Sequence, residues 1–249
     1  MAEPDDDSRI ILSIFNYCDR RCERCTFTER CTLFKDLRKY EHQHPNRGPF
    51  EQARDRFQDV FRLLEQWCER EGIDFDELRR QAHSDQSVGT IEGRDASVRA
   101  DPLQKIATTY THAALKLVDA LAAARALRAW PPDVAEAIDT IAWHAGLVSS
   151  KTYRALIGFA ERGGLPEEDD LGQSDWNGSA KVVRLIIAES KDAWFKVMRA
   201  GGAADDSPLT ELVSLLERLD AGLAERFPRA MEFIRPGFDE PWRAGSFVT

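Results

Sequence analysis

Four of the five cysteines of the chain lie within fourteen consecutive residues near the N-terminus. They are Cys18, Cys22, Cys25 and Cys31, separated by gaps of three, two and five residues. Thiolate sulfur is a strong ligand for zinc and for iron–sulfur clusters. Because the gaps are short, one turn-rich loop can bring all four side chains together. The spacing therefore predicts a metal centre whose ligands are these four cysteines.

The same spacing favours an iron–sulfur cluster over zinc. Structural zinc sites usually pair two Cys-x2–4-Cys knuckles across a longer connection, and this segment has no such connection. Compact runs of cysteines are common in iron–sulfur proteins. We therefore expect a [4Fe–4S] cluster, with zinc as the alternative. The N-terminal residues lack the basic segment followed by an apolar segment that is typical of a signal peptide, so we expect a reducing compartment. Disulfides between these cysteines are therefore disfavoured.

Three of the cysteines also match a known pattern, Cys-x2-Cys-x5-Cys with a phenylalanine in the longer gap. The ten residues that match are Cys22-Glu23-Arg24-Cys25-Thr26-Phe27-Thr28-Glu29-Arg30-Cys31. This segment resembles the iron–sulfur tail of WhiB-like regulators and of some iron–sulfur helicase-nucleases. The resemblance implies iron–sulfur ligation by the three cysteines. In those families the fourth cysteine lies far away in sequence, whereas Cys18 lies close by, and their DNA-related activities do not carry over.

A second local match is the cysteine triplet of radical SAM enzymes, which Cys18, Cys22 and Cys25 reproduce. Those enzymes carry a βα barrel after the triplet and leave one iron open for the substrate. This chain has no strand-like alternation that could build a barrel, and Cys31 would occupy the open iron. We therefore expect no radical SAM chemistry, and the sequence leaves open whether the protein is an enzyme.

Apolar residues recur at spacings of three and four along most of the chain, which predicts helices. Helices are therefore the elements expected to position the cysteines. The pattern predicts a short helix that stops near His44, before Pro45. A longer helix over residues 50–70 and a short one over 75–82 follow. In the longer helix Cys68 shares the apolar stripe, so it is expected to be a buried thiol. Residues 84–100 are rich in Ser, Gly and charge, and we interpret them as a linker.

The second half of the chain predicts four long amphipathic helices. They begin at Asp101-Pro102, at Asp133 with Glu136 completing a capping box, near Ser179, and at Ser207-Pro208. Helices of this length in sequence pack best as an antiparallel bundle. The predicted fold is therefore all-α, with a C-terminal antiparallel four-helix bundle and an N-terminal cysteine-rich metal-binding loop with helices. The corresponding domains are residues 1–83, a linker at 84–100 and residues 101–249, which end in an irregular arm.

Other metal ligands are sparse on the predicted bundle. Di-iron bundles use inward-facing Glu-x-x-His pairs, and the one such pair is Glu41 with His44, outside the long helices. His144 and Asp220 flank the apolar stripes of their helices and remain candidates. Glu189 points away from the apolar stripe of its own helix and is expected to face solvent. An oxidase-type metal site within the bundle is therefore disfavoured.

Composition sets the class of protein and of partner. Hydrophobic residues make up 43% of the 249 residues, enough to bury a core, and the net charge of −9 disfavours general nucleic-acid binding. No apolar run approaches the roughly 18–20 residues that span a bilayer, so we expect no membrane association and a cytoplasmic location. Residues 18–39 nevertheless carry seven basic and four acidic side chains, which could offset a negative metal centre or bind an acidic partner.

These observations predict an iron–sulfur protein that acts in electron transfer or in redox or oxygen sensing. The helical bundle would serve as the platform for a protein redox or regulatory partner. The alternative is a zinc-stabilised helical protein-interaction module without redox chemistry.

Overall fold

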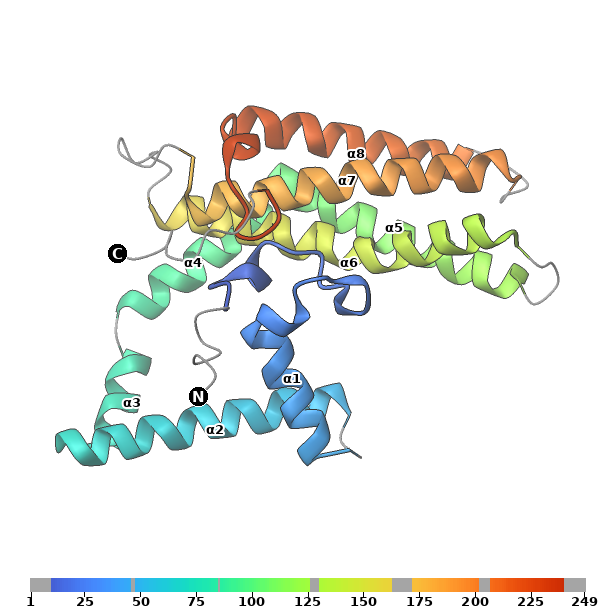
Figure 1. Ribbon diagram of the computed structural model, residues 1–249. Helices are drawn as coiled ribbons and strands as arrows, with labels where there is room; N and C mark the ends of the chain where they lie inside the picture. Colours follow the sequence, from blue (N-terminus) through green and yellow to red (C-terminus); the bar gives the residue numbers. More distant parts are fainter. Residues whose placement is uncertain are drawn as a thin grey trace. The chain divides into compact units, whose positions relative to one another are not determined.

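The computed structural model describes residues 10–45, 48–84, 86–125, 130–162, 172–201 and 207–239 (Figure 1). Within these ranges the chain forms helices and turns and contains no strand, which confirms the prediction of an all-helical protein. No helix among them is long and apolar enough to cross a membrane. The described chain divides into two compact units, with boundaries between Leu12 and Ser13, between Arg21 and Cys22, and between Gly93 and Arg94.

The first unit contains residues 10–12 and 22–93 of the described chain. Its elements are η3 (Cys22–Arg24), η4 (Thr28–Arg30), α1 (Thr32–Gln43), α2 (Pro49–Glu71), α3 (Phe75–Ser84) and the first half of α4 (Gln86–Ala100). Helix α1 ends at the residue before His44, as predicted from Pro45. Helix α2 ends at Glu71 and is capped by Gly72, whose φ of 68° lies in the left-handed region that glycine adopts without a Cβ clash.

The range 84–100, expected to be an irregular linker, contains helix α4 (Gln86–Ala100). Its Gly and Ser residues lower helix propensity without forbidding a helix, and its apolar residues are few. In the part of α4 that belongs to the second unit, Arg99 Nε donates to Asp95 Oδ2 at 2.8 Å, one turn away. The Tyr153 hydroxyl donates to the other oxygen of Asp95 at 2.6 Å, so this half of α4 is held by contacts within its own unit.

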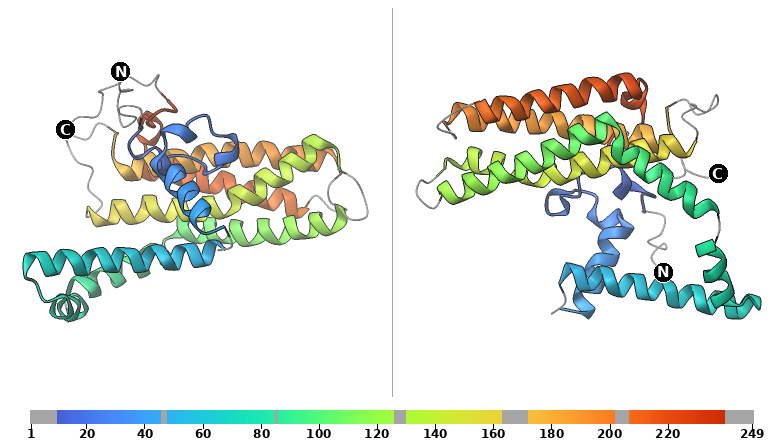
Figure 2. Two further views of the ribbon diagram at one scale, coloured as in Figure 1. Left: turned by 60° about the horizontal axis from the view of Figure 1, so that its bottom comes forward. Right: turned by 180° about the vertical axis from the view of Figure 1, so that it is seen from behind.

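The second unit contains residues 13–21 and the described residues from Arg94 onward. Its long helices are α5 (Pro102–Arg125), α6 (Pro132–Glu161), α7 (Asp175–Arg199) and α8 (Ser207–Arg226), which we call the helical body. Helix α6 packs on α5 and α7, and α8 packs on the same two helices. Consecutive helices run in opposite directions (Figures 1 and 2). The core is mainly apolar, and the buried Trp194 Nε1 donates to the buried Tyr110 hydroxyl at 3.1 Å.

Two of the four predicted helix starts differ from the structure, and the starts of α5 and α8 agree with it. At α5, Asp101 Oδ1 accepts the N–H of Leu103 at 2.8 Å, the expected N-cap contact. The capping box predicted at Asp133 is wrong, because α6 starts one residue earlier at Pro132, where no N–H needs an acceptor. Helix α7 starts at Asp175 instead of Ser179, because the Ser174 hydroxyl accepts the N–H of Asn177 and caps the helix early.

Candidate metal centre

Residues 13–21, which include the first cysteine, lie on the helical body. Ile14, in the short helix η2 (Ile14–Asn16), and Tyr17 are buried. The Tyr17 ring packs against the ring of Phe233 at 4.6 Å between centroids, and its hydroxyl donates to Asp175 Oδ1 at 2.8 Å. Burial, followed by this bond to Asp175, raises the pKa of the Tyr17 phenol. The residue next to Cys18 is therefore anchored on α7.

Two cations on α6 hold the same segment. Lys151 Nζ donates to the backbone carbonyl of Asn16, and Arg154 Nη1 donates to Asn16 Oδ1 at 3.2 Å. Arg154 also donates twice to Asp175, both times at 3.0 Å. The spacing of three places Lys151 and Arg154 on one side of the helix. Burial, followed by the charge of Arg20, lowers the pKa of Lys151 to about 8.

Cys18 therefore lies in a cationic environment. Its thiol donates to the carbonyl of Phe15 at 3.6 Å. Burial raises the pKa of this thiol, while a backbone hydrogen bond from Arg20 and the charges of Arg20 and Lys151 act in the opposite direction. Burial alone disfavours a thiolate, but the nearby cations favour one once a metal replaces the proton.

A tight turn follows Cys18 and is held by α6. Asp19 Oδ1 accepts the N–H of Arg21 at 3.1 Å, and Arg20 has a φ of 62°, which costs a non-glycine residue about 1–2 kcal/mol. Trp143 Nε1 donates to the Asp19 carbonyl at 2.6 Å, and Arg21 donates to the Thr140 hydroxyl at 3.3 Å. These contacts from α6 hold the strained turn in place.

The other three predicted ligands belong to the first unit. Cys22 opens η3, and the N–H of Cys25 donates to the Cys22 carbonyl at 3.2 Å to close this turn. Cys25 Sγ accepts the N–H of Phe27 at 3.4 Å. Cys31 precedes α1 and is buried, whereas Cys22 and Cys25 are partly exposed. Two short 3₁₀ turns thus supply these three sulfurs.

All five cysteines are free thiols, so the sulfurs are chemically available to a metal. Within the described ranges, however, no three His, Cys, Asp or Glu side chains lie close enough together to hold a metal ion. Cys22, Cys25 and Cys31, which share the first unit, are thus not converged on one point. Cys68 is fully buried in α2, as predicted for a structural thiol. The donor set has the chemistry of a soft-metal centre, and its side chains would have to converge on binding.

His144, the bundle candidate, is a buried neutral imidazole. Its Nδ1 lies 3.2 Å from the hydroxyl of Ser190, and its Nε2 lies 3.6 Å from a carboxylate oxygen of Glu189. Burial lowers the pKa of His144 to about 4, opposed by the charge of Asp19 and assisted by that of Arg21. Since Ser190 is fully buried, this Ser–His–Glu arrangement is closed to a substrate. We interpret it as a structural polar cluster.

The other bundle candidate, Asp220, is engaged in an ion pair. Its Oδ1 accepts from Arg184 Nε at 2.7 Å, between α8 and α7. Glu189 keeps a largely exposed side chain, in agreement with the expected solvent-facing position. Neither carboxylate therefore belongs to a set of metal ligands within the described helices.

The depressed pKa of His144 predicts a pH-dependent stability. The unfolded chain takes up a proton near pH 6.5, whereas the folded chain resists protonation down to about pH 4, so stability is present above this window and falls within it. We expect the wild type to lose about 2 kcal/mol more than His144→Gln between pH 7 and pH 5. Urea unfolding of both proteins across this range measures the difference. Parallel curves would show that the imidazole titrates normally.

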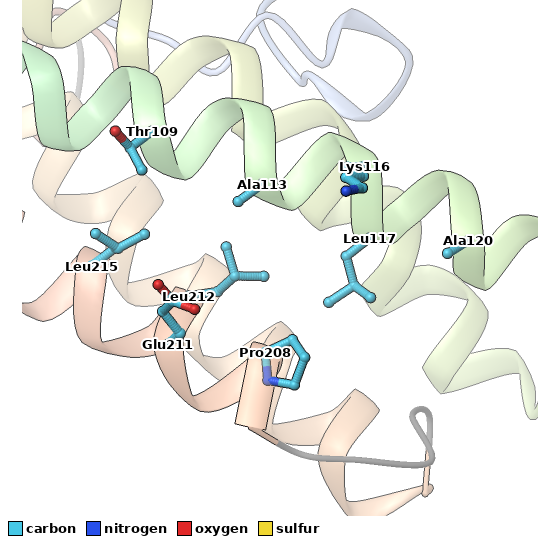
Figure 3. Close-up of a pocket in the computed structure, with 9 residues that line it drawn as sticks. All are labelled: Thr109, Ala113, Lys116, Leu117, Ala120, Pro208, Glu211, Leu212 and Leu215. Carbon is cyan, nitrogen blue, oxygen red and sulfur yellow. The ribbon is translucent and has the colours of Figure 1, made fainter.

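A trough of about 360 Å³ lies elsewhere on the helical body, between α5 and α8 (Figure 3). Gly222 allows α8 to lie against Leu103 near one end of the pair. Further along, small side chains such as Ala113 and Ala120 leave the space between the helices unfilled. The lining is mainly apolar, so the trough offers no ligand set for a metal.

Sequence reasoning identified the cysteines but missed the residues that hold Cys18. Asn16, Tyr17, Lys151 and Arg154 are far apart in sequence or carry no motif, and only the spacing of three between Lys151 and Arg154 hinted at a shared role. The chain matches no protein-family model, and no curated protein or solved structure is significantly similar to it. The candidate site must therefore be interpreted from its own chemistry.

Proposed function

We propose that Cys18, Cys22, Cys25 and Cys31 ligate a [4Fe–4S] cluster that serves electron transfer or the sensing of redox state or oxygen. The observation that carries the proposal is the presence of four free thiols within fourteen residues, with gaps of three, two and five. Such compact thiol runs are typical of iron–sulfur ligation. When bound, the cluster would supply one-electron chemistry that the side chains of this protein lack.

The surroundings of Cys18 support a thiolate-bound centre. Arg20 and Lys151 place positive charge near the Cys18 sulfur, which offsets the negative charge that a thiolate ligand brings. The N–H of Phe27 donates to the sulfur of Cys25. Hydrogen bonds to sulfur and nearby charge are the means by which proteins adjust the reduction potential of a cluster.

The proposal requires the four thiols to converge when iron and sulfide bind. Metal binding and local folding are commonly coupled, because a preformed site is rare without its metal. The 3₁₀ turns η3 and η4 are short, so the segment can rearrange without unfolding a long helix. A reducing compartment such as the cytoplasm is implied, because a disulfide would remove two ligands.

For the helical body we propose the antiparallel four-helix bundle class, with the bundle acting as the platform for a protein redox or regulatory partner. Its helices make the contacts expected of such a bundle, α5 and α7 each packing on α6 and on α8. Residues 13–21 are bound to this body through Tyr17, Asn16 and Asp19. A partner bound to the bundle would therefore lie close in structure to the first cysteine.

The test is the metal content of the full chain, produced and purified without oxygen. We expect about four irons and four sulfides per chain and a broad visible absorption that bleaches on reduction. About one zinc and no colour would overturn the iron–sulfur proposal in favour of a zinc-stabilised interaction module. Protein that binds neither metal would overturn both.

A further inference from the structure

One side of helix α2 is apolar and exposed to solvent. The exposed side chains are Phe57, Val60, Phe61, Leu63, Leu64 and Trp67, which we call the α2 apolar face. Their spacing places them along one side of the helix. Phe57 is 69% exposed and Leu63 is 65% exposed, values typical of surface polar residues. Contiguous apolar patches of this kind mark interaction surfaces, because they are rare on free monomers.

The area of the face is sufficient for a specific interface only when two such faces meet. Three aromatic side chains of roughly 150–250 Å² each, about half exposed, together with three aliphatic ones give an apolar area on the order of 500 Å². Two faces pressed together would remove on the order of 1,000 Å² from water, which reaches the lower limit for a specific protein interface. An isologous contact supplies this doubling from a single type of chain.

Helix α2 has no dominant charge that would attract a strongly acidic or strongly basic partner. The helix carries four arginines and six carboxylates, so its net charge is small. Several of these charges pair within the helix: Arg62 lies 3.0 Å from Asp59, and Arg54 lies 3.7 Å from Asp55. An interface with an apolar centre and no dominant charge is typical of homodimers.

We propose that the α2 apolar face binds the same face of a second copy of this chain, forming a homodimer with twofold symmetry. Phe57, Val60, Leu64 and Trp67 follow the alternating spacing of three and four by which two helices pack side by side. Twofold dimers are the commonest assemblies of identical chains. The proposal is independent of the metal centre, because it rests on the surface of α2 alone.

The test is the mass of the full chain in solution, measured by sedimentation equilibrium from nanomolar to high micromolar concentration. The wild type is expected to approach twice the chain mass of 28.2 kDa. In the double variant Phe57→Glu, Phe61→Glu, two buried carboxylates would raise the dissociation constant by roughly 100-fold or more. Phe195→Glu, a matched change at an exposed phenylalanine of α7, is expected to leave the dissociation constant unchanged.

Leu63→Lys provides a second variant. Because the Leu63 side chain is exposed in the single chain, the lysine should not disturb the fold, and the helical circular dichroism of the variant should match that of the wild type. This variant is also expected to shift the equilibrium toward the single chain. A wild type that remains a single chain at the highest concentration would overturn the proposal. A dimer that persists in both α2 variants would overturn it equally, because the contact would then lie on another surface.

Discussion

Cys22→Ser is expected to reduce the bound iron from about four atoms per chain to less than one and to remove the visible absorption. A serine hydroxyl ionises far less readily than a thiol and is a poor ligand for the soft iron–sulfur core. Cys22 is the first residue of the turn η3, and its carbonyl accepts the N–H of Cys25, so it is adjacent in structure to a second predicted ligand. Iron and sulfide analysis with visible spectroscopy, on protein kept without oxygen, measures the loss.

Cys68→Ala is the matched control for this prediction. Cys68 is a fully buried thiol of α2, outside the fourteen-residue run, and behaves as a small hydrophobic side chain. Its replacement should lower the stability modestly and leave the iron and sulfide content unchanged. Equal metal loss in both variants would indicate general unfolding, and retained iron in Cys22→Ser would exclude that cysteine as an essential ligand.

Gly178→Val is expected to destabilise the second unit by about 3 kcal/mol, at the upper end of overpacking costs. A Cβ at position 178 would lie 2.5 Å from Cε1 of Tyr17 and 2.7 Å from Cζ of Phe233. Both rings are buried, so neither can turn into solvent without losing its contacts. The expected result is a lower urea midpoint, together with faster hydrogen exchange in residues 13–21.

Gly146→Val is the control, because nothing lies within 4 Å of the corresponding Cβ position on α6. That change also places valine in a helix interior, so propensity effects of a few tenths of a kcal/mol are common to both variants. A similar small effect in the two variants would show that Tyr17 does not pack against Gly178 in solution.

Helix positions were predictable wherever periodicity and end signals agreed. The recurrence of apolar residues at spacings of three and four and the Asp101-Pro102 start together defined α5, and the helix begins where they predicted. Helix α4 was missed because Ser, Gly and charged residues dominate its sequence and its apolar residues are few. The predicted start of α6 at Asp133 was wrong because proline suits the first position of a helix, and Pro132 occupies that position one residue earlier.

The candidate site was predictable only at the level of ligand chemistry. The types and spacing of the cysteines point to a metal, and these belong to one short segment. The environment of Cys18 depends on Lys151, Arg154 and Gly178, which lie more than 130 residues downstream on α6 and α7. Contacts of this kind arise from tertiary packing, for which neither local spacing nor composition carries a signal.

The hydrogen bond from the Trp143 indole to the Asp19 carbonyl has a spectroscopic consequence. Trp143 is 42% exposed, whereas Trp194 is fully buried in the core. Indole emission shifts to longer wavelength as water replaces protein around the ring, so Trp143 should report on release of residues 13–21 and Trp194 on loss of the core. With the other five tryptophans of the chain replaced by phenylalanine, Trp143 would be an optical reporter in direct contact with the turn that follows Cys18, readable without any added label.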